Sequence, residues 1–505
     1  MKQPLTRARL TRSLPSLAAL WWALGPRRAV AQTAIPASPS PAMPAPSVTP
    51  GAEVAPEAEA APGEDSRYEA ADRYLRERMS RARTPGLAVV IVEANHVTFT
   101  RGYGAADRES GREMTAVTPV PLATAVQGMT ALAVMQLVER GQVSLDAPVR
   151  QYLPTFTMLD PRAAEITVRH LLSHRAGIPQ SAAFDGAQDS GALARRVASL
   201  AQVRLDFPPG SGFRYSNDGF NVAGLVVQTV TGIPYEQYMA EQIFGPLEMT
   251  RTTFDPVVAA RWAPAQGYAK HRGVLTPAPT VFSGGYNPSA MAISTAADIG
   301  TYLIGLLNGG TYRNRRVVGW PSVEEMWTPG VATGEDGGMY GLGCFIVDAD
   351  GMRFVVHGGD LDTAGSQILL VPERRLGVGV FTNLSGWEKN EFAQDLMRIM
   401  LGAEPLPHPT LPDWRSSTFV PDRSVWAVYA GRYETSQGPL EIVQQGEKLV
   451  GTIAGQGLEF VPLSDTTFVL LSDFSSIDEM PAAFAVLADG TVALELAGTR
   501  FAVKR

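Results

Sequence analysis

The sequence predicts an α+β fold, in which an antiparallel sheet is flanked by helices and is followed by a separate unit made of strands. Apolar strand patterns lie near both ends of the larger unit, at 87–103 and at 340–383, and helical patterns fill the stretch between them. This order favours one sheet built from early and late segments, with a helical subdomain in the middle. Beyond residue 426, short apolar runs alternate with turn residues, which is typical of an all-β unit.

Composition is ordinary for a globular protein and argues against several classes of function. The chain has 505 residues, 45% of them hydrophobic and 18% charged, which is enough for two or three domains. The net charge is -7 and no basic block occurs, so we expect no nucleic-acid partner. The single cysteine, Cys344, excludes an intramolecular disulfide. His170 and His174 lack the intervening glutamate of a zinc-protease motif, so we expect no metal and no other cofactor.

The first 31 residues have the pattern of a secretory signal peptide. Basic residues precede a short apolar run at 14–24, and Ala29-Val30-Ala31 matches a small-residue cleavage site. Arg27 and Arg28 depart from the pattern because they lie between the run and that site. The run is too short to span a bilayer. We therefore expect a periplasmic or secreted protein with no transmembrane span after cleavage; retention of the segment as an anchor is the alternative.

The chain is expected to divide into five stretches. Residues 1–31 form the signal peptide, and 32–64 are rich in alanine and proline, as in a flexible or semi-rigid tether. The main domain is expected at 65–403. A proline-rich linker at 404–425 then leads to the all-β unit at 426–505.

The main domain begins with a helix and a strand pair. Helical spacing of apolar residues predicts a helix over 68–83, which Pro85-Gly86 ends. Strands at 87–93 and 97–103 follow, and Ala94-Asn95 forms the turn between them.

The next helix, expected over 127–140, is apolar on nearly all sides and should therefore be buried. Gly141 ends it. Thr124 lies just before it, where an N-cap hydroxyl would lie. The partial positive charge at a helix N-terminus also favours a developing anion, so Thr124 is a candidate both for a cap and for a nucleophile.

Further elements follow in order. Thr167 is expected to cap a short helix that ends before Gly177, and His170 and His174 are expected to pack against and cap that helix. Later helices are expected at 222–230 and up to about 307, with Ser294 and Asp298 interpreted as caps of the second. Strands are expected at 340–345, 353–359, 367–371 and 378–383, and then at 440–444, 449–453, 458–461, 468–471, 483–487, 492–496 and 501–503.

Five landmarks occur in order between residues 68 and 383. They are the paired first strands, Leu171-Leu172-Ser173-His174 with Gly177-Ile178-Pro179, Tyr215-Ser216-Asn217, Ser294-Thr295-Ala296 with Asp298, and His357-Gly358-Gly359. Together they resemble the serine β-lactamase and penicillin-binding-protein family, especially its class C β-lactamase, D-aminopeptidase and esterase-like branch. The resemblance implies a β-lactamase-like antiparallel sheet with an all-helical subdomain. Residues 426–505 resemble the small lipocalin-like β-barrel that often follows this domain.

The resemblance also implies where the site residues lie. The family's first motif is Ser-x-x-Lys, and the ungapped match places Thr124 at the serine and Gln127 at the lysine. The second motif, Tyr-x-Asn, is intact as Tyr215 and Asn217, and the third begins at His357.

The third motif also implies the substrate contacts. The strand through Gly359 would bind the substrate backbone, and the backbone N–H groups of Asp360 and Thr124 would form the oxyanion hole. Other positions depart from the family pattern: Val120-Pro121 replaces Phe-Arg, Ala290-Met291 replaces Gly-Gly, and Asp362-Thr363-Ala364 replaces Pro-Gly-Phe.

These changes affect the expected chemistry. A neutral hydroxyl needs a base before it can attack a carbonyl, and the amide of Gln127 cannot accept its proton near neutral pH. Tyr215 could act as that base only with a lowered pKa, and His357 is the one other candidate. We therefore expect an exported, catalytically impaired member that binds a peptidic or cell-wall-like ligand. The alternative is an active amide or ester hydrolase with Thr124 as nucleophile, acting on a small peptide, a β-lactam or an ester.

Overall fold

The structure is a computed structural model that describes residues 66–504 with gaps at 182–183, 334–337, 407, 409–413, 418, 436–437, 454–455, 474–476, 488 and 497–498. The expected signal peptide at 1–31 and tether at 32–64 lie outside the described residues, as does most of the proline-rich run at 406–413. No described helix is both long enough and apolar enough to cross a membrane.

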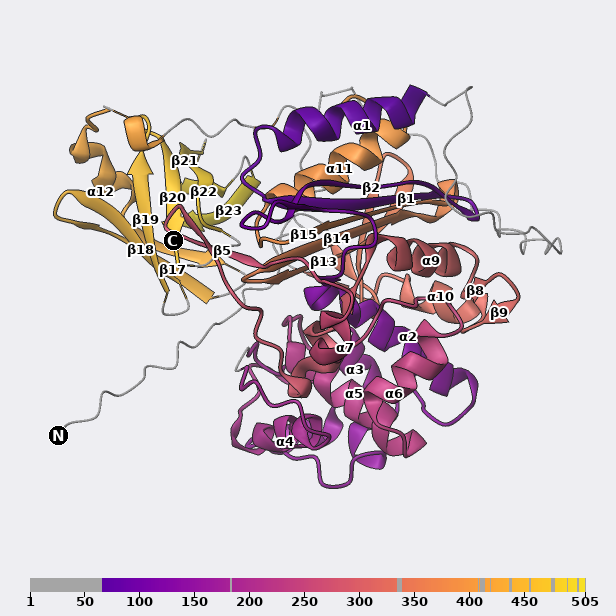
Figure 1. Cartoon of the computed structure of the whole chain (residues 1–505). Helices are drawn as coiled ribbons and strands as arrows, with labels where there is room; N and C mark the ends of the chain where they lie inside the picture. The colour runs from indigo at the N-terminus through magenta and orange to yellow at the C-terminus, as the bar shows by residue number, and fades with distance from the viewer. Residues whose placement is uncertain are drawn as a thin grey trace, which may run out of the picture.

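A nine-stranded antiparallel sheet forms the centre of the larger unit (Figure 1). Its strand order is β10-β11-β12-β13-β14-β15-β1-β2-β3, so the early strands pair with the last one, as the sequence predicts. The strands are β1 (Gly86–Glu93), β2 (His96–Asp107), β3 (Arg112–Glu113), β10 (Val331–Ala332), β11 (Met339–Tyr340), β12 (Phe345–Ala349), β13 (Met352–Leu361), β14 (Ala364–Val371) and β15 (Leu376–Thr382).

Helices cover both faces of this sheet. Helices α1 and α11 lie on one face, and α2, α9 and the helical subdomain lie on the other (Figure 1). The helices are α1 (Ser66–Met79), α2 (Val126–Glu139), α3 (Val168–Leu172), α4 (Ala192–Ser199), α5 (Asn217–Thr231), α6 (Tyr235–Met239), α7 (Pro256–Ala260), α8 (Asn287–Ala290), α9 (Ala296–Leu307), α10 (Trp320–Met326) and α11 (Glu388–Met400).

The position of β1 explains why its sequence is apolar without alternation. Leu87, Val89 and Ile91 pack into the core beneath α1 and α11, while Val90 and Val92 pack into the core shared with α2. A strand buried on both faces has no solvent side and therefore carries no polar positions. Three small antiparallel pairs complete the domain: β4 (Val120–Pro121) with β7 (Ile293–Ser294), β5 (Tyr268–His271) with β6 (Val274–Pro277), and β8 (Thr311–Tyr312) with β9 (Arg315–Arg316).

The central helix α2 is buried as expected, since all residues from Val126 to Leu137 are buried. The prediction that Thr124 caps it is wrong. A turn of 3-10 helix over Ala123–Ala125 precedes α2, so Thr124 lies inside helical backbone, and Ala125 is the N-cap without any side-chain cap. The Thr124 hydroxyl instead donates to the carbonyl oxygen of Gly358 at 3.0 Å.

Other helix boundaries were predicted with mixed success. Thr167 caps α3 as predicted, and the imidazole of His170 completes a reciprocal capping pair with it. Helix α5 begins at Asn217, five residues earlier than predicted, because the hydroxyl of Ser216 caps it by accepting from the Gly219 N–H. The stretch 340–345 is not one strand, since β11 ends at residue 340 and β12 starts at 345.

The caps predicted for α9 are wrong. Thr295 is the N-cap, and its hydroxyl accepts from the backbone N–H of Asp298. The Asp298 carboxylate accepts from the hydroxyl of Thr252, and this hydroxyl is also 2.7 Å from that of Ser294. Both expected caps are therefore used to fix the segment that precedes α7.

The C-terminal unit is a closed eight-stranded barrel, beside the main sheet in Figure 1, so the expected fold class is confirmed in both parts. A short helix, α12 (Trp426–Tyr429), precedes β16 (Gly431–Thr435), β17 (Gly438–Gln445), β18 (Lys448–Ile453), β19 (Gln456–Pro462), β20 (Thr467–Ser472), β21 (Met480–Val486), β22 (Val492–Leu496) and β23 (Thr499–Lys504). The sequence predicted seven of these strands and not β16, which closes the barrel by pairing with β23. The chosen domain boundaries remain predictions.

Candidate active site

The fold brings the three sequence motifs together on one side of β13. Thr124 and Gln127 come from the start of α2, Tyr215 and Asn217 from the start of α5, and His357 from β13 itself. Each of these side chains is at most 6% exposed. The predicted site residues thus meet in one buried cluster, while their catalytic roles remain predictions.

Close backbone approach positions Thr124. A Cβ atom added to Gly359 would lie 2.5 Å from the Thr124 nitrogen and 2.6 Å from the Leu122 oxygen, so only glycine fits there. The Ser366 hydroxyl, on the neighbouring strand β14, donates to the Leu122 carbonyl at 2.5 Å. Ala123 has a φ of +49°, a conformation that costs free energy for any residue with a side chain. The sheet therefore holds the turn before α2 in a strained shape.

Gln127 makes the hydrogen bonds that fix the site. Its Nε2 donates to the Tyr215 hydroxyl at 2.8 Å and to Asn217 Oδ1 at 3.1 Å, which uses both amide hydrogens. Its Oε1 accepts from the hydroxyl of Tyr340 at 3.4 Å. Tyr340 was not among the predicted site residues, because its position at the end of β11 carries no motif.

Tyr215 and His357, two titratable residues of the predicted site, are both neutral near pH 7. Burial raises the pKa of Tyr215 well above its usual value, although contacts with Thr124 and Gln127 oppose the shift. Burial also lowers the pKa of His357 to about 4, although its contact with the Gly358 carbonyl opposes this shift. The Tyr215 phenol therefore keeps its proton, and the His357 imidazole is uncharged.

The tautomer of His357 follows from its contacts. Its Nδ1 lies 2.8 Å from the Gly358 carbonyl oxygen, which can only accept, so Nδ1 carries the hydrogen. The basic Nε2 lies 3.4 Å from the Tyr340 hydroxyl. The same Gly358 carbonyl also accepts the Thr124 hydroxyl. The basic atom of His357 therefore contacts Tyr340, and the hydroxyl of Thr124 is bound to a carbonyl that cannot take its proton.

The side chain of Asp360 belongs to the opposite face of the sheet, because side chains alternate along a strand. Lys389 Nζ, from α11, lies 2.8 Å from both of its carboxylate oxygens, and the Ser385 hydroxyl donates to it at 2.6 Å. This buried ion pair connects the end of β13 to helix α11. The part predicted for the Asp360 backbone N–H is independent of this and remains a prediction.

Two buried donors near the site have no acceptor among the described residues. One is Asn217 Nδ2, and the other is Nε2 of His174. The Nδ1 of His174 accepts from the Ser216 N–H at 3.1 Å, and the ring packs 4.2 Å from that of Tyr215, so His174 supports the second motif as packing. Asn217 Nδ2 is thus a buried donor without a partner among the described residues.

An apolar cluster adjoins Thr124. It contains Ala123, Tyr286, Ala290, Met291 and Leu361, with Phe184 and Phe282 packed against it. The Ala290-Met291 pair that departs from the family pattern is thus part of this cluster. Within the described parts of the chain, no three His, Cys, Asp or Glu residues lie together as a metal site would require.

The close approach at Gly359 gives a testable prediction. Gly359→Ala should destabilise the protein by about 1–3 kcal/mol, because a methyl group there meets backbone atoms that cannot rotate away. Gly386→Ala is the matched control, since a Cβ there has no neighbour within 4 Å, and it should change stability by less than about 0.5 kcal/mol. Denaturant unfolding measures both, and equal stabilities of the two variants would contradict the geometry.

Comparison with known proteins finds relatives of similar sequence. Protein Flp of Staphylococcus aureus (strain MW2) is 26% identical over 317 residues, which cover 62% of this chain and 62% of Flp. This chain therefore spans about three fifths of the length of that relative. Esterase EstB of Burkholderia gladioli is 33% identical over 210 residues, which cover 38% of this chain and 52% of EstB.

Solved structures show the fold of the chain, and a family model shows its family. The octameric penicillin-binding protein homologue from Pyrococcus abyssi superimposes with a TM-score of 0.62 at 24% identity, over 87% of this chain and 100% of that one. At that identity the likeness shows the fold. The Beta-lactamase family model matches residues 71–401, which is more than half of the chain. The chain belongs to the beta-lactamase family of the serine hydrolase superfamily.

Proposed function

We propose that this protein binds a small amide or ester ligand, of peptidic or cell-wall-like chemistry, without carrying out acyl transfer. The observation that carries the proposal is the state of Gln127. The residue at the lysine position is a neutral amide whose two Nε2 hydrogens are bound by Tyr215 and Asn217. It preserves the contacts within the site and supplies no base.

The neighbouring groups do not replace the missing base. Attack by a hydroxyl requires an adjacent group that takes its proton. The Tyr215 phenol keeps its own proton because its pKa is raised, and the basic nitrogen of His357 contacts Tyr340. The extra methyl group of Thr124 also restricts rotation about χ1 and crowds an approaching carbonyl. Loss of one member of a catalytic group that acts as a unit costs several orders of magnitude in rate.

Ligand binding needs less than catalysis does. The unpartnered Asn217 Nδ2 can donate to a carbonyl oxygen of an amide or ester. The backbone N–H groups of Thr124 and Asp360 would provide a second place for a carbonyl. Because the site residues are neutral, an uncharged carbonyl compound suits them better than an anion. The esterase activity in the name of the relative EstB is in line with this ligand class.

Reversal of both substitutions tests the proposal. We expect no turnover of a chromogenic cephalosporin, nitrophenyl esters or D-amino-acid peptides by the native chain. The double variant Thr124→Ser with Gln127→Lys should gain at least about 100-fold in kcat/KM on one of them, because nucleophile and base are then both present. Thr124→Ser alone is the control and should stay inactive.

The alternative, an active hydrolase with Thr124 as nucleophile, makes the opposite prediction for the same assay. It requires turnover by the native chain that Thr124→Val removes while the melting temperature is retained. That result would refute the proposal of a binding protein. Melting curves of all variants separate loss of activity from loss of folding.

We also propose that the protein is exported, because its first 31 residues have the charge, length and cleavage pattern of a signal peptide. Expression of the full chain in a Gram-negative host should yield a product outside the cytoplasm that begins at Gln32. Ala31→Glu should block cleavage and leave the longer chain. N-terminal sequencing of cell fractions measures this, and an uncleaved cytoplasmic product of the native chain would argue against export.

A further inference from the structure

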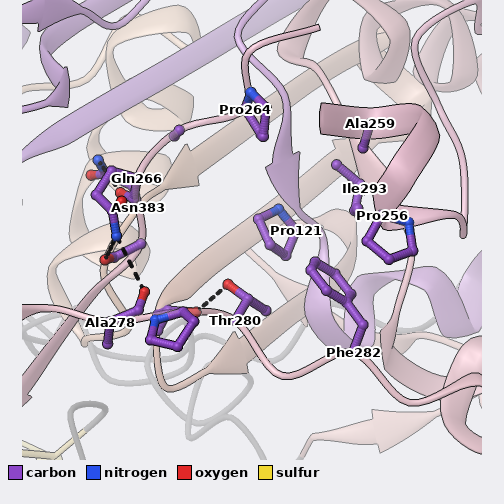
Figure 2. A pocket seen from close by; sticks show the side chains of 14 residues that line it. Pro121, Pro256, Ala259, Pro264, Gln266, Ala278, Thr280, Phe282, Ile293 and Asn383 are labelled. Carbon is purple, nitrogen blue, oxygen red and sulfur yellow. Dashed lines mark hydrogen bonds between the residues drawn. The ribbon is translucent and has the colours of Figure 1, made fainter. Parts of the chain in front are cut away.

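A cavity of about 180 Å³ lies beside the buried cluster (Figure 2). Its walls come from β4, α7 and β7, from residues 264–267 and 278–282, and from Thr363 and Asn383. None of the predicted catalytic residues lines it. We call it the side pocket, and what it binds is a question separate from the chemistry of Thr124.

Among the residues that the structure describes, no charged side chain lines the side pocket. Its two amides are already engaged with the backbone. Gln266 Nε2 donates to the carbonyls of Gly267 and Ala278, and Asn383 Nδ2 donates to the carbonyl of Gln266. Figure 2 draws hydrogen bonds of this set. Because the amide hydrogens are already donated to backbone carbonyls, the side pocket does not offer them to a ligand.

The hydroxyl groups of the side pocket are paired with each other. Thr280 and Thr363 lie with their hydroxyl oxygens 2.5 Å apart, which closes one wall. The rest of the lining is mostly apolar, and Figure 2 shows Pro121, Ile293 and Phe282 around the same space. Such a cavity disfavours an ion, because nothing in it would compensate for the loss of hydration.

Two exposed valines are sequence neighbours of residues that line the side pocket. Val257 is 67% exposed and follows the lining residue Pro256. Val281 is 47% exposed and lies between two lining residues, Thr280 and Phe282.

We propose that the side pocket binds one uncharged aromatic or branched aliphatic group of about the size of a benzene ring. An apolar protein cavity of roughly 150 Å³ holds benzene, so the volume of the side pocket suits such a group. The proposal goes beyond the proposed function, because it concerns residues other than the nucleophile position and holds whether or not Thr124 reacts.

The barrel holds one wall of the side pocket in place. Gly267 and Ala278 flank the hairpin of β5 and β6, and the tip of this hairpin reaches the barrel (Figure 1). There the Arg272 N–H donates to the Ser472 carbonyl at 2.8 Å, and the Gly273 N–H donates to the Asp478 carboxylate at 2.6 Å. A wall fixed at both ends keeps the cavity formed without a ligand, which lowers the cost of binding.

Phe282 links the side pocket to the buried cluster. It lines the cavity and also packs against the apolar residues around Ala123 and Leu361, next to Thr124. Pro121, which also lines the cavity, lies three residues before Thr124 in the chain. A group in the side pocket is therefore placed beside the position where a ligand carbonyl would be bound.

Binding of benzyl alcohol to the full chain, followed by saturation-transfer NMR, tests the proposal. Benzyl alcohol should bind saturably. Benzoate and benzylammonium, which have the same ring, should bind at least about tenfold more weakly because their charges find no partner. Absence of saturable binding by benzyl alcohol, or equal binding by all three compounds, would overturn it.

Two neighbouring alanines of α7 provide matched variants. Ala259 is buried and lines the cavity, while Ala260 is exposed on the same helix. Ala259→Leu should fill the cavity and weaken benzyl alcohol binding by at least about tenfold, whereas Ala260→Leu should change it less than about twofold. Equal binding by the two variants would place the compound elsewhere and refute the assignment.

A second variant covers the case in which Ala259→Leu does not fold. Phe282→Ala removes a ring from the wall and enlarges the cavity. It should bind naphthalenemethanol at least about tenfold more tightly than the native chain does, because only the enlarged cavity admits two fused rings. Unchanged binding of naphthalenemethanol by folded Phe282→Ala would count against the side pocket as the site.

Discussion

The hydrogen bonds from Gln127 Nε2 to Tyr215 and Asn217 are the interaction on which the site depends. They join the start of α2 to the start of α5, so one neutral amide holds two of the three motifs together. An ammonium group at this place would bring positive charge and a titratable proton. The amide brings neither, and this is the basis of the proposal that the protein binds a ligand without acyl transfer.

Burial also keeps the titratable side chains of Tyr215 and His357 uncharged. It raises the pKa of Tyr215 and lowers that of His357, so both are uncharged near pH 7, and the side pocket beside them contains no charged residue. The buried ion pair between Asp360 and Lys389 is on the other face of β13. This ion pair holds β13 against α11. The residues on the other face, where a ligand is proposed to bind, are neutral and favour uncharged compounds.

The sequence was sufficient for the fold class and for one sheet built from early and late strands, because apolar strand patterns lie near both ends of the domain and the motifs occur in order. It also named Thr124 and Gln127 as site residues; the structure buries both in one cluster with Tyr215, and their roles remain predictions. It failed where a long-range contact decides the structure. Tyr340 enters the site from β11 without a motif, and the Asp360 carboxylate depends on a distant lysine. Local patterns cannot encode such contacts.

Intact-mass spectrometry of the native chain after incubation with a β-lactam or an activated ester tests the central claim most directly. The account predicts an unmodified mass, because the Thr124 hydroxyl is bound to the Gly358 carbonyl and no base is in contact with it. A stoichiometric acyl adduct that peptide mapping locates on Thr124 would contradict this and show that the nucleophile position is still reactive.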